Sequence, residues 1–84
     1  MFLHVTGVNH IKAYELRIEF NNGEIKKVDL SGELYGEIFE PLKDPAFFTQ
    51  VGVNKETNTI EWPNGADFAP EFLYEFGTRV EPVA

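Results

Sequence analysis

Cysteine is absent from this chain of 84 residues. Disulfide bonds, thiolate catalysis and zinc sites with cysteine ligands are therefore excluded, and a reducing compartment is the expected environment. No apolar run approaches the roughly 20 residues that a membrane-spanning helix needs. Residues 1–5 contain neither a basic segment nor a long apolar core, so we expect no signal peptide. Together these absences predict a cytoplasmic, soluble protein.

Basic residues are also scarce. Seven Lys and Arg stand against fourteen Asp and Glu, which gives a formal net charge of −7. Nucleic-acid binding needs clustered Lys and Arg, and the nearest approach to a cluster, Lys26-Lys27, is flanked by Glu24 and Asp29. We therefore expect no direct contact with DNA or RNA. A basic partner protein is favoured instead, because complementary electrostatic fields accelerate encounter.

The length predicts a single domain, residues 1–84, with no room for a second core. Aromatic residues make up 14% of the chain, including eight Phe, and such large side chains allow a small core to close without disulfides. We expect a compact part at about residues 2–77 and a loosely held tail at residues 78–84.

Residues 13–20 show the clearest strand pattern, because apolar and charged side chains alternate along them. A turn at Asn21-Asn22-Gly23 then predicts a hairpin with the segment that follows. A two-residue loop would place Leu16 opposite Asp29 and bury charge. A three-residue loop with Gly23 in the left-handed region pairs Leu16 with Val28, and a shift of one residue reverses every side chain, so the pattern favours the longer loop.

Two further strand regions complete the predicted sheet. Residues 2–9 read as a first strand that ends at Asn9-His10, with Gly7 marking a bulge or a close backbone approach. Residues 51–53 and 59–62 flank a turn-like segment and predict a second hairpin.

Two short helices are expected. Asp44 can cap a helix that begins at Pro45, and Pro70 suits the first turn of a last helix that ends at Gly77. The predicted fold is α+β: an antiparallel sheet of about five strands, formed by two hairpins plus an N-terminal strand, with both helices packed on one face. The core residues expected from these patterns are Leu16, Ile18, Phe20, Val28, Leu30, Phe48, Ile60, Leu73 and Phe76.

The segment from Trp62 to Asp67 is the candidate site of most interest. Pro63 supplies the fixed φ of a turn's second position, Asn64 tolerates the third and Gly65 the fourth. Asp67 can fold its carboxylate back onto nearby backbone amides. Trp62 has two interpretations, core packing at the end of a strand or an exposed binding hot spot, and core packing ranks first.

Catalytic and metal-binding chemistry has little support. His4 and His10 could act as metal ligands or as a general base, but no third ligand follows at a recognised metal spacing, and a strand histidine and a loop histidine are the simpler interpretation. Asp29 and Asp67 could serve as paired carboxylates of an enzyme or a small-molecule binder. We expect no enzyme activity, no cofactor and no metal.

Several motifs in a fixed order resemble those of a known family, the domain of unknown function 2442. They cover roughly residues 10–77, and the Trp-Pro-Asn-Gly-Ala-Asp run is the most specific of them. The motifs are Tyr14-x-Leu16-x-Ile18-x-Phe20 with Gly23, Val28-Asp29-Leu30, Phe39-Glu40-Pro41-Leu42-Lys43-Asp44-Pro45 with Phe48, and Ile60-x-Trp62-Pro63-Asn64-Gly65-Ala66-Asp67 with Leu73-Tyr74.

The resemblance implies a small bacterial α+β domain without an assigned activity. Members of that family occur alone or fused to a helix-turn-helix DNA-binding domain, and they are often encoded beside another small protein, an arrangement suggestive of toxin–antitoxin pairs. The functional hypothesis is an acidic interaction module that binds, and in doing so restrains or regulates, a small basic protein. Binding through an exposed sheet edge or the Trp62 turn is expected, and pairing with a second copy of the chain is a further alternative.

Overall fold

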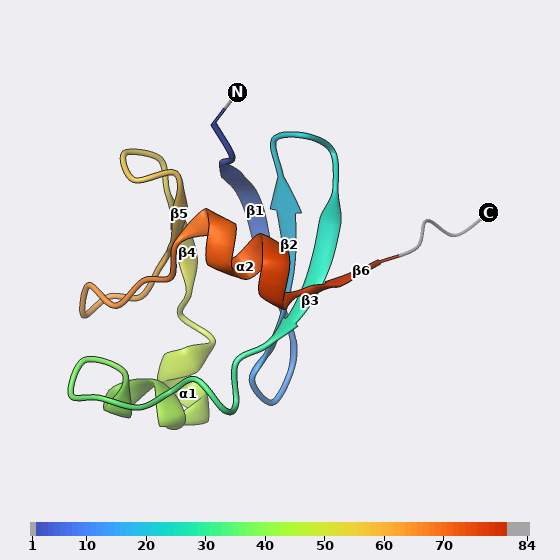
Figure 1. Cartoon of the computed structure of the whole chain (residues 1–84). Coiled ribbons are helices and arrows are strands. Elements are labelled where there is room, and N and C mark those ends of the chain that lie inside the picture. Colours follow the sequence, from blue (N-terminus) through green and yellow to red (C-terminus); the bar gives the residue numbers. More distant parts are fainter. Residues whose placement is uncertain (1, 81–84) are drawn as a thin grey trace.

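Alternating apolar residues build a four-stranded antiparallel sheet at the centre of the molecule (Figure 1). The computed structural model describes residues 2–80. Strands β1, β2, β3 and β6 lie side by side in that order, and β4 and β5 form a separate two-stranded sheet. The strand bounds are β1 Val5–Lys12, β2 Glu15–Phe20, β3 Ile25–Asp29, β4 Gly52–Asn54, β5 Thr59–Glu61 and β6 Thr78–Arg79.

The predicted register of the β2–β3 hairpin is confirmed. Leu16 lies opposite Val28, and the three loop residues Asn21-Asn22-Gly23 connect the strands. Gly23 has a φ of 87°, in the left-handed region that a non-glycine residue adopts only with strain. This register directs the apolar residues of both strands into the core, where Leu16 and Val28 are fully buried.

Strand β1 lies three residues further along the chain than the predicted strand at residues 2–9, because it begins at Val5. It continues through His10 to Lys12, so the predicted end at Asn9-His10 is wrong. A tight turn joins β1 to β2, with Ala13 at a φ of 46°, and alanine gives no sequence signal for that conformation. The predicted irregularity at Gly7 is confirmed, because the β1–β2 register shifts between Val5 and Gly7.

The predicted single sheet of about five strands is wrong, although the α+β class and the antiparallel pairing are confirmed. The β4–β5 hairpin forms, but it stands beside the main sheet as a sheet of its own (Figure 1). The N–H of Val5 donates a hydrogen bond of 2.9 Å to the carbonyl oxygen of Asn58, which fastens the β4–β5 hairpin to the start of β1.

Two α-helices begin where the sequence predicts. Helix α1 (Pro45–Phe48) starts after Asp44, whose carboxylate accepts a hydrogen bond of 3.1 Å from the N–H of Ala46. A 3₁₀ helix, η1 (Glu40–Lys43), precedes it. Helix α2 (Pro70–Phe76) packs against β3 and crosses in front of the main sheet in Figure 1.

The expected tail includes two residues that belong to the sheet. Thr78 and Arg79 form β6 and pair with Lys27 and Lys26 of β3, so the compact part extends beyond residue 77. Residues 81–84 of the predicted tail lie outside the described residues. Among residues 2–80, no helix combines the length and the apolar character that crossing a membrane requires.

The core lies between the main sheet, α2, α1 and the β4–β5 hairpin. Eight of the nine expected core residues are buried there. The exception is Phe76, whose side chain is 47% exposed, so its assignment to the core is wrong. Phe76 lies in the last turn of α2, beyond the part of the core in which Leu73 is buried. The core residues not predicted from the sequence patterns are Val5, Leu34, Leu42 and Ala66.

Candidate functional site

The segment Trp62–Asp67 is a tight turn that connects β5 to the approach of α2. The N–H of Gly65 donates to the carbonyl oxygen of Trp62 at 2.9 Å, and the N–H of Trp62 donates to the carbonyl oxygen of Ala66 at 2.9 Å. The first bond closes the turn with Pro63 and Asn64 at its two central positions, as the sequence predicts. Gly65 adopts a φ of 89°.

Asn64, and not Asp67, supplies the side chain that secures the turn. Its Oδ1 accepts a hydrogen bond of 3.1 Å from the N–H of Ala66, and its Nδ2 donates one of 2.9 Å to the carbonyl oxygen of Ile38. The Asp67 side chain is exposed, and its carboxylate accepts no hydrogen bond from the described residues. The backbone of Asp67 instead forms an isolated bridge with Glu61. The expected role of Asp67 as a cap of the turn is therefore wrong.

Trp62 packs in the core. Its side chain is 1% exposed, and its indole Nε1 donates a hydrogen bond of 2.9 Å to the carbonyl oxygen of Phe48. The rings of Trp62 and Phe48 lie 5.5 Å apart, which joins the β4–β5 sheet to α1. A buried indole cannot meet a partner, so the exposed residues of the turn are Pro63, Asn64, Gly65 and Asp67.

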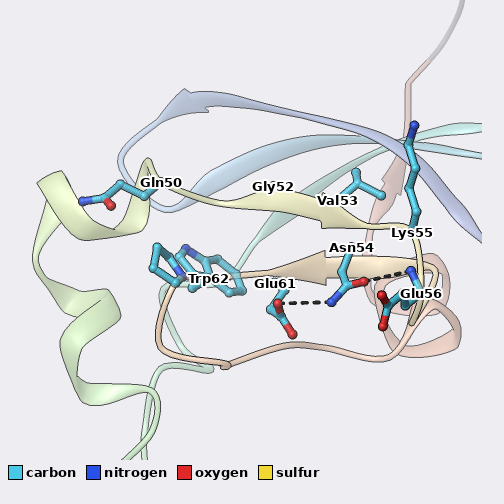
Figure 2. A pocket seen from close by; sticks show the side chains of 9 residues that line it. Gln50, Gly52, Val53, Asn54, Lys55, Glu56, Glu61 and Trp62 are labelled. Carbon is cyan, nitrogen blue, oxygen red and sulfur yellow. Dashed lines mark hydrogen bonds between the residues drawn. The ribbon is translucent and has the colours of Figure 1, made fainter.

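An open hollow of about 520 Å³ lies over the β4–β5 sheet (Figure 2). Asn54 and Glu61 project from adjacent strands into it, and the Nδ2 of Asn54 donates a hydrogen bond of 3.2 Å to Glu61 Oε1. The Oδ1 of Asn54 accepts from the N–H of Glu56 at 2.8 Å. These two bonds of Asn54 hold the β4–β5 hairpin together, so the Asn54–Glu61 pair has a structural role in the hollow.

The two aspartates of the enzymatic alternative occupy different parts of the fold. Asp29 ends β3 in the main sheet, whereas Asp67 lies beside β5 in the other sheet. Asp29 is bound to the turn that follows it: its Oδ1 accepts a hydrogen bond of 3.0 Å from the N–H of Ser31. The hydrogen bonds from Ser31, first from its N–H and then from its side chain, hold the pKa of Asp29 below the usual 3.8.

The two histidines lie just before β1 and within it, in ordinary structural settings. His4 immediately precedes the strand, and its N–H donates a hydrogen bond of 2.9 Å to Asn21 Oδ1. His10 sits within the strand, where its Nε2 donates a hydrogen bond of 2.8 Å to the carbonyl oxygen of Ala13. Within residues 2–80, no three His, Asp or Glu side chains gather closely enough to hold a metal ion.

A row of phenylalanine rings was missed by the sequence patterns. Consecutive ring centroids are separated by 4.9 Å between Phe39 and Phe68, 5.5 Å between Phe68 and Phe72, and 5.0 Å between Phe72 and Phe76. The first three side chains are half-buried and Phe76 is exposed. The four-residue spacing of Phe68, Phe72 and Phe76 was the available signal, since such a spacing lines one side of a helix.

Comparisons with known proteins find one family and one solved structure. The model of a family described as "Protein of unknown function (DUF2442)" matches residues 5–79. The crystal structure of NE0471 from Nitrosomonas europaea, a protein whose name proposes that it binds DNA, is 26% identical with a TM-score of 0.79. The match covers 90% of this chain and 49% of that one, so this chain spans about half the length of its structural relative. A search of curated proteins gave no significant match.

Proposed function

The chain belongs to the DUF2442 family, whose function is unknown. We propose, from the charge of its own surface, that it is a protein-interaction module that binds a small basic protein. The observation that carries this proposal is the net charge of −7 on 84 residues. Among residues 2–80, four ion pairs engage four of the thirteen acidic side chains, since the fourteenth, Glu81, lies outside the described residues. The remaining charge produces a negative field that attracts a cationic partner and speeds its encounter.

An antitoxin-like or regulatory role is the finer form of this proposal. It is supported by the gene arrangement typical of the family, in which a member is encoded beside another small protein. An acidic domain that covers a basic surface of such a neighbour would restrain that neighbour's activity. The site geometry is compatible with this role, because the hollow over the β4–β5 sheet is open and its Asn54–Glu61 pair is hydrogen-bonded within the fold.

An enzyme that uses Asp29 and Asp67 has less support. The two carboxylates belong to different sheets, and Asp29 is engaged by the turn at Ser31. General acid–base catalysis needs groups within reach of one substrate, and environments that separate their pKa values. We therefore propose that the chain is not an enzyme.

DNA binding is proposed for the longer relative by its name, but we do not extend it to this chain. The match leaves about half of that protein outside the comparison. The negative charge of this chain would repel a phosphate backbone, whose binding is dominated by cationic contacts. Any DNA contact of the relative is expected to lie in the half that this chain does not share.

The test is affinity capture of the tagged chain from its native host, with washes at low and then high salt and mass spectrometry of the retained proteins. We expect a small basic protein that is retained at low salt and released at high salt, because salt screens interactions between exposed charges. Failure to enrich any basic protein at low salt would overturn the proposal.

A further inference from the structure

The phenylalanine row, defined as Phe39, Phe68, Phe72 and Phe76, is a continuous apolar ridge that is partly exposed. Phe39, Phe68 and Phe72 are half-buried against the core, and Phe76 reaches the surface. The rings of the row are neighbours at 4.9 to 5.5 Å, and Phe76 at its end is 47% exposed. Ile38, next to Phe39 in the chain, is also 47% exposed. An exposed apolar ridge of this kind is typical of interaction sites, whereas scattered single apolar residues are ordinary on protein surfaces.

An acidic residue directly precedes three members of the row in the sequence, and we call these residues, Asp67, Glu71 and Glu75, the carboxylate stripe. The three pairs are Asp67-Phe68, Glu71-Phe72 and Glu75-Phe76, each four residues after the last. All three carboxylates are exposed, and none forms an ion pair with the described residues. Glu71 lies in the first turn of α2, where a negative charge is favourable, whereas Glu75 follows it by four residues, a spacing at which like charges weaken a helix slightly. Asp67 lies outside the helix.

The inner side of α2 packs against the rest of the fold. Leu73 is fully buried, and the Tyr74 ring packs edge-on against Phe20 with centroids 5.1 Å apart. Lys26 lies over the Tyr74 ring at 4.4 Å from its centroid. The Phe72 and Phe76 side and the carboxylate side are therefore the parts of α2 that remain for a partner.

We propose that the phenylalanine row and its carboxylate stripe form the docking face for a cationic amphipathic helix of the partner protein. This inference rests on the proposed function and adds to it the surface and the chemistry of the bound segment. Rings separated by 5.0 and 5.5 Å match the rise of about 5.4 Å per helical turn, so apolar residues on successive turns of a partner helix can lie against successive rings. Lys or Arg residues flanking that apolar face would meet Asp67, Glu71 and Glu75.

A second copy of the chain is a poorer occupant of this face. Two copies joined through the row would bring two carboxylate stripes close together, and each copy carries a net charge of −7. Like charges placed opposite each other at an interface cost binding free energy. A cationic helix instead supplies the opposite charge, so charge complementarity favours it over self-association.

The test is an NMR titration of the full chain with synthetic helical peptides. The probe is a Leu/Lys peptide of about 18 residues with leucines at helical spacing, which exceeds the length at which isolated helices become stable. One control peptide has the same composition in an order without an apolar face, and another carries Glu in place of Lys. We expect the amide signals of Phe68–Phe76 to shift with the Leu/Lys helix and with neither control.

Matched variants assign the contact to the row. Phe76→Ser is compared with Phe2→Ser, since Phe2 is 85% exposed and lies outside the row. Glu75→Gln is compared with Glu56→Gln in the β4–β5 turn, and both side chains are exposed. Phe76→Ser and Glu75→Gln are each expected to weaken binding about fivefold or more, as hot-spot truncations do, and the controls less than twofold.

Three outcomes would overturn the inference. They are absence of shifts at α2 with the Leu/Lys peptide, equal effects of the row variants and their controls, and self-association of the free chain that Phe76→Ser abolishes. These experiments distinguish failure of this inference from failure of the proposed function. If wild type and Phe76→Ser capture the same basic protein equally well, the chain is still an interaction module but the phenylalanine row is not its binding surface. If no basic protein is captured although the peptide binds the row, the proposed function fails. The peptide result then shows only that the row can bind a cationic helix.

Discussion

Single residues in the turn between β5 and α2 determine how the second sheet leads into the helix. Trp62 fixes the turn from inside the core, through its packing on Phe48 and its hydrogen bond to that residue's carbonyl oxygen. Asn64 fixes it from outside by bonding to both Ala66 and Ile38. The turn is thus held by one buried indole and one exposed amide. It leads into the segment that contains Phe68, Phe72 and Phe76.

Gly65 is the residue of this turn whose replacement has the clearest expected effect. Its φ of 89° is unfavourable for a β-branched side chain, so Gly65→Val should destabilise the fold by about 1–3 kcal/mol. For a domain of this size that loss lowers the melting temperature by about 4–8 °C per kcal/mol. Thermal unfolding followed by circular dichroism measures the difference.

Gly52→Val is the matched control for that substitution. Gly52 lies in β4, and an added Cβ meets no atom within 4 Å, so a valine fits the extended backbone there. Equal melting temperatures for Gly65→Val and Gly52→Val would contradict the structural role of the turn.

At the scale of elements, a polar cluster ties α2 to the β2–β3 loop. The hydroxyl of Tyr74 donates a hydrogen bond to Glu24, and Asn22 Nδ2 donates one of 3.2 Å to the Tyr74 hydroxyl. Arg79 of β6 pairs with Glu24 at 3.3 Å. One carboxylate therefore connects a helix, a loop and the last strand, which holds the exposed side of α2 in a fixed orientation.

This cluster predicts a titration effect. The hydrogen bond to Glu24 raises the pKa of Tyr74 above the usual 10.0. The stabilisation from the neutral phenol is present below pH 10.0 and is lost as the pH rises through the higher folded pKa. Glu24→Gln should move the Tyr74 pKa back toward 10.0, as followed by the ring carbon signals in NMR. The control Glu56→Gln should leave the Tyr74 pKa unchanged. If Glu24→Gln does not lower the Tyr74 pKa, the proposed effect of the Tyr74–Glu24 hydrogen bond is contradicted.

The elements themselves were largely predictable from local patterns, but their assembly was not. The β2–β3 register followed from the alternation around Leu16 and from Gly23, because a shift of one residue would have buried Asp29. The starts of α1 and α2 followed from Asp44-Pro45 and Pro70. The division into two sheets could not be predicted, since strands of either sheet show the same alternation.

The outward position of the phenylalanine row could not be predicted from helical periodicity alone. Phe72 and Phe76 on one side of α2 read as a core-facing stripe, and that interpretation led to the wrong assignment of Phe76. Leu73 is the residue that faces inward, and a helix of seven residues has room for few such contacts. The acidic residues that precede Phe68, Phe72 and Phe76 were visible in the sequence, and all three are exposed.

At the scale of the whole molecule, charge is the property that separates the functional hypotheses. The net charge of −7 favours a basic protein and disfavours nucleic acid. We predict that a fluorescently labelled DNA duplex shows no saturable anisotropy change with up to about 10 μM of this chain at physiological salt, where non-specific DNA binders have dissociation constants of about 1–100 μM. Saturable binding in that range would contradict the exclusion of nucleic acid, and a known basic DNA-binding protein serves as the positive control.

We propose above all that the chain binds a basic protein through the phenylalanine row. The most direct measurement is parallel affinity capture from the native host with three baits: wild type, Phe76→Ser and Phe2→Ser. We predict that one small basic protein is recovered with wild type and Phe2→Ser, is released by high salt, and is reduced by about fivefold or more with Phe76→Ser. Recovery of no basic protein with any bait, or of the same amount with all three, would contradict the account.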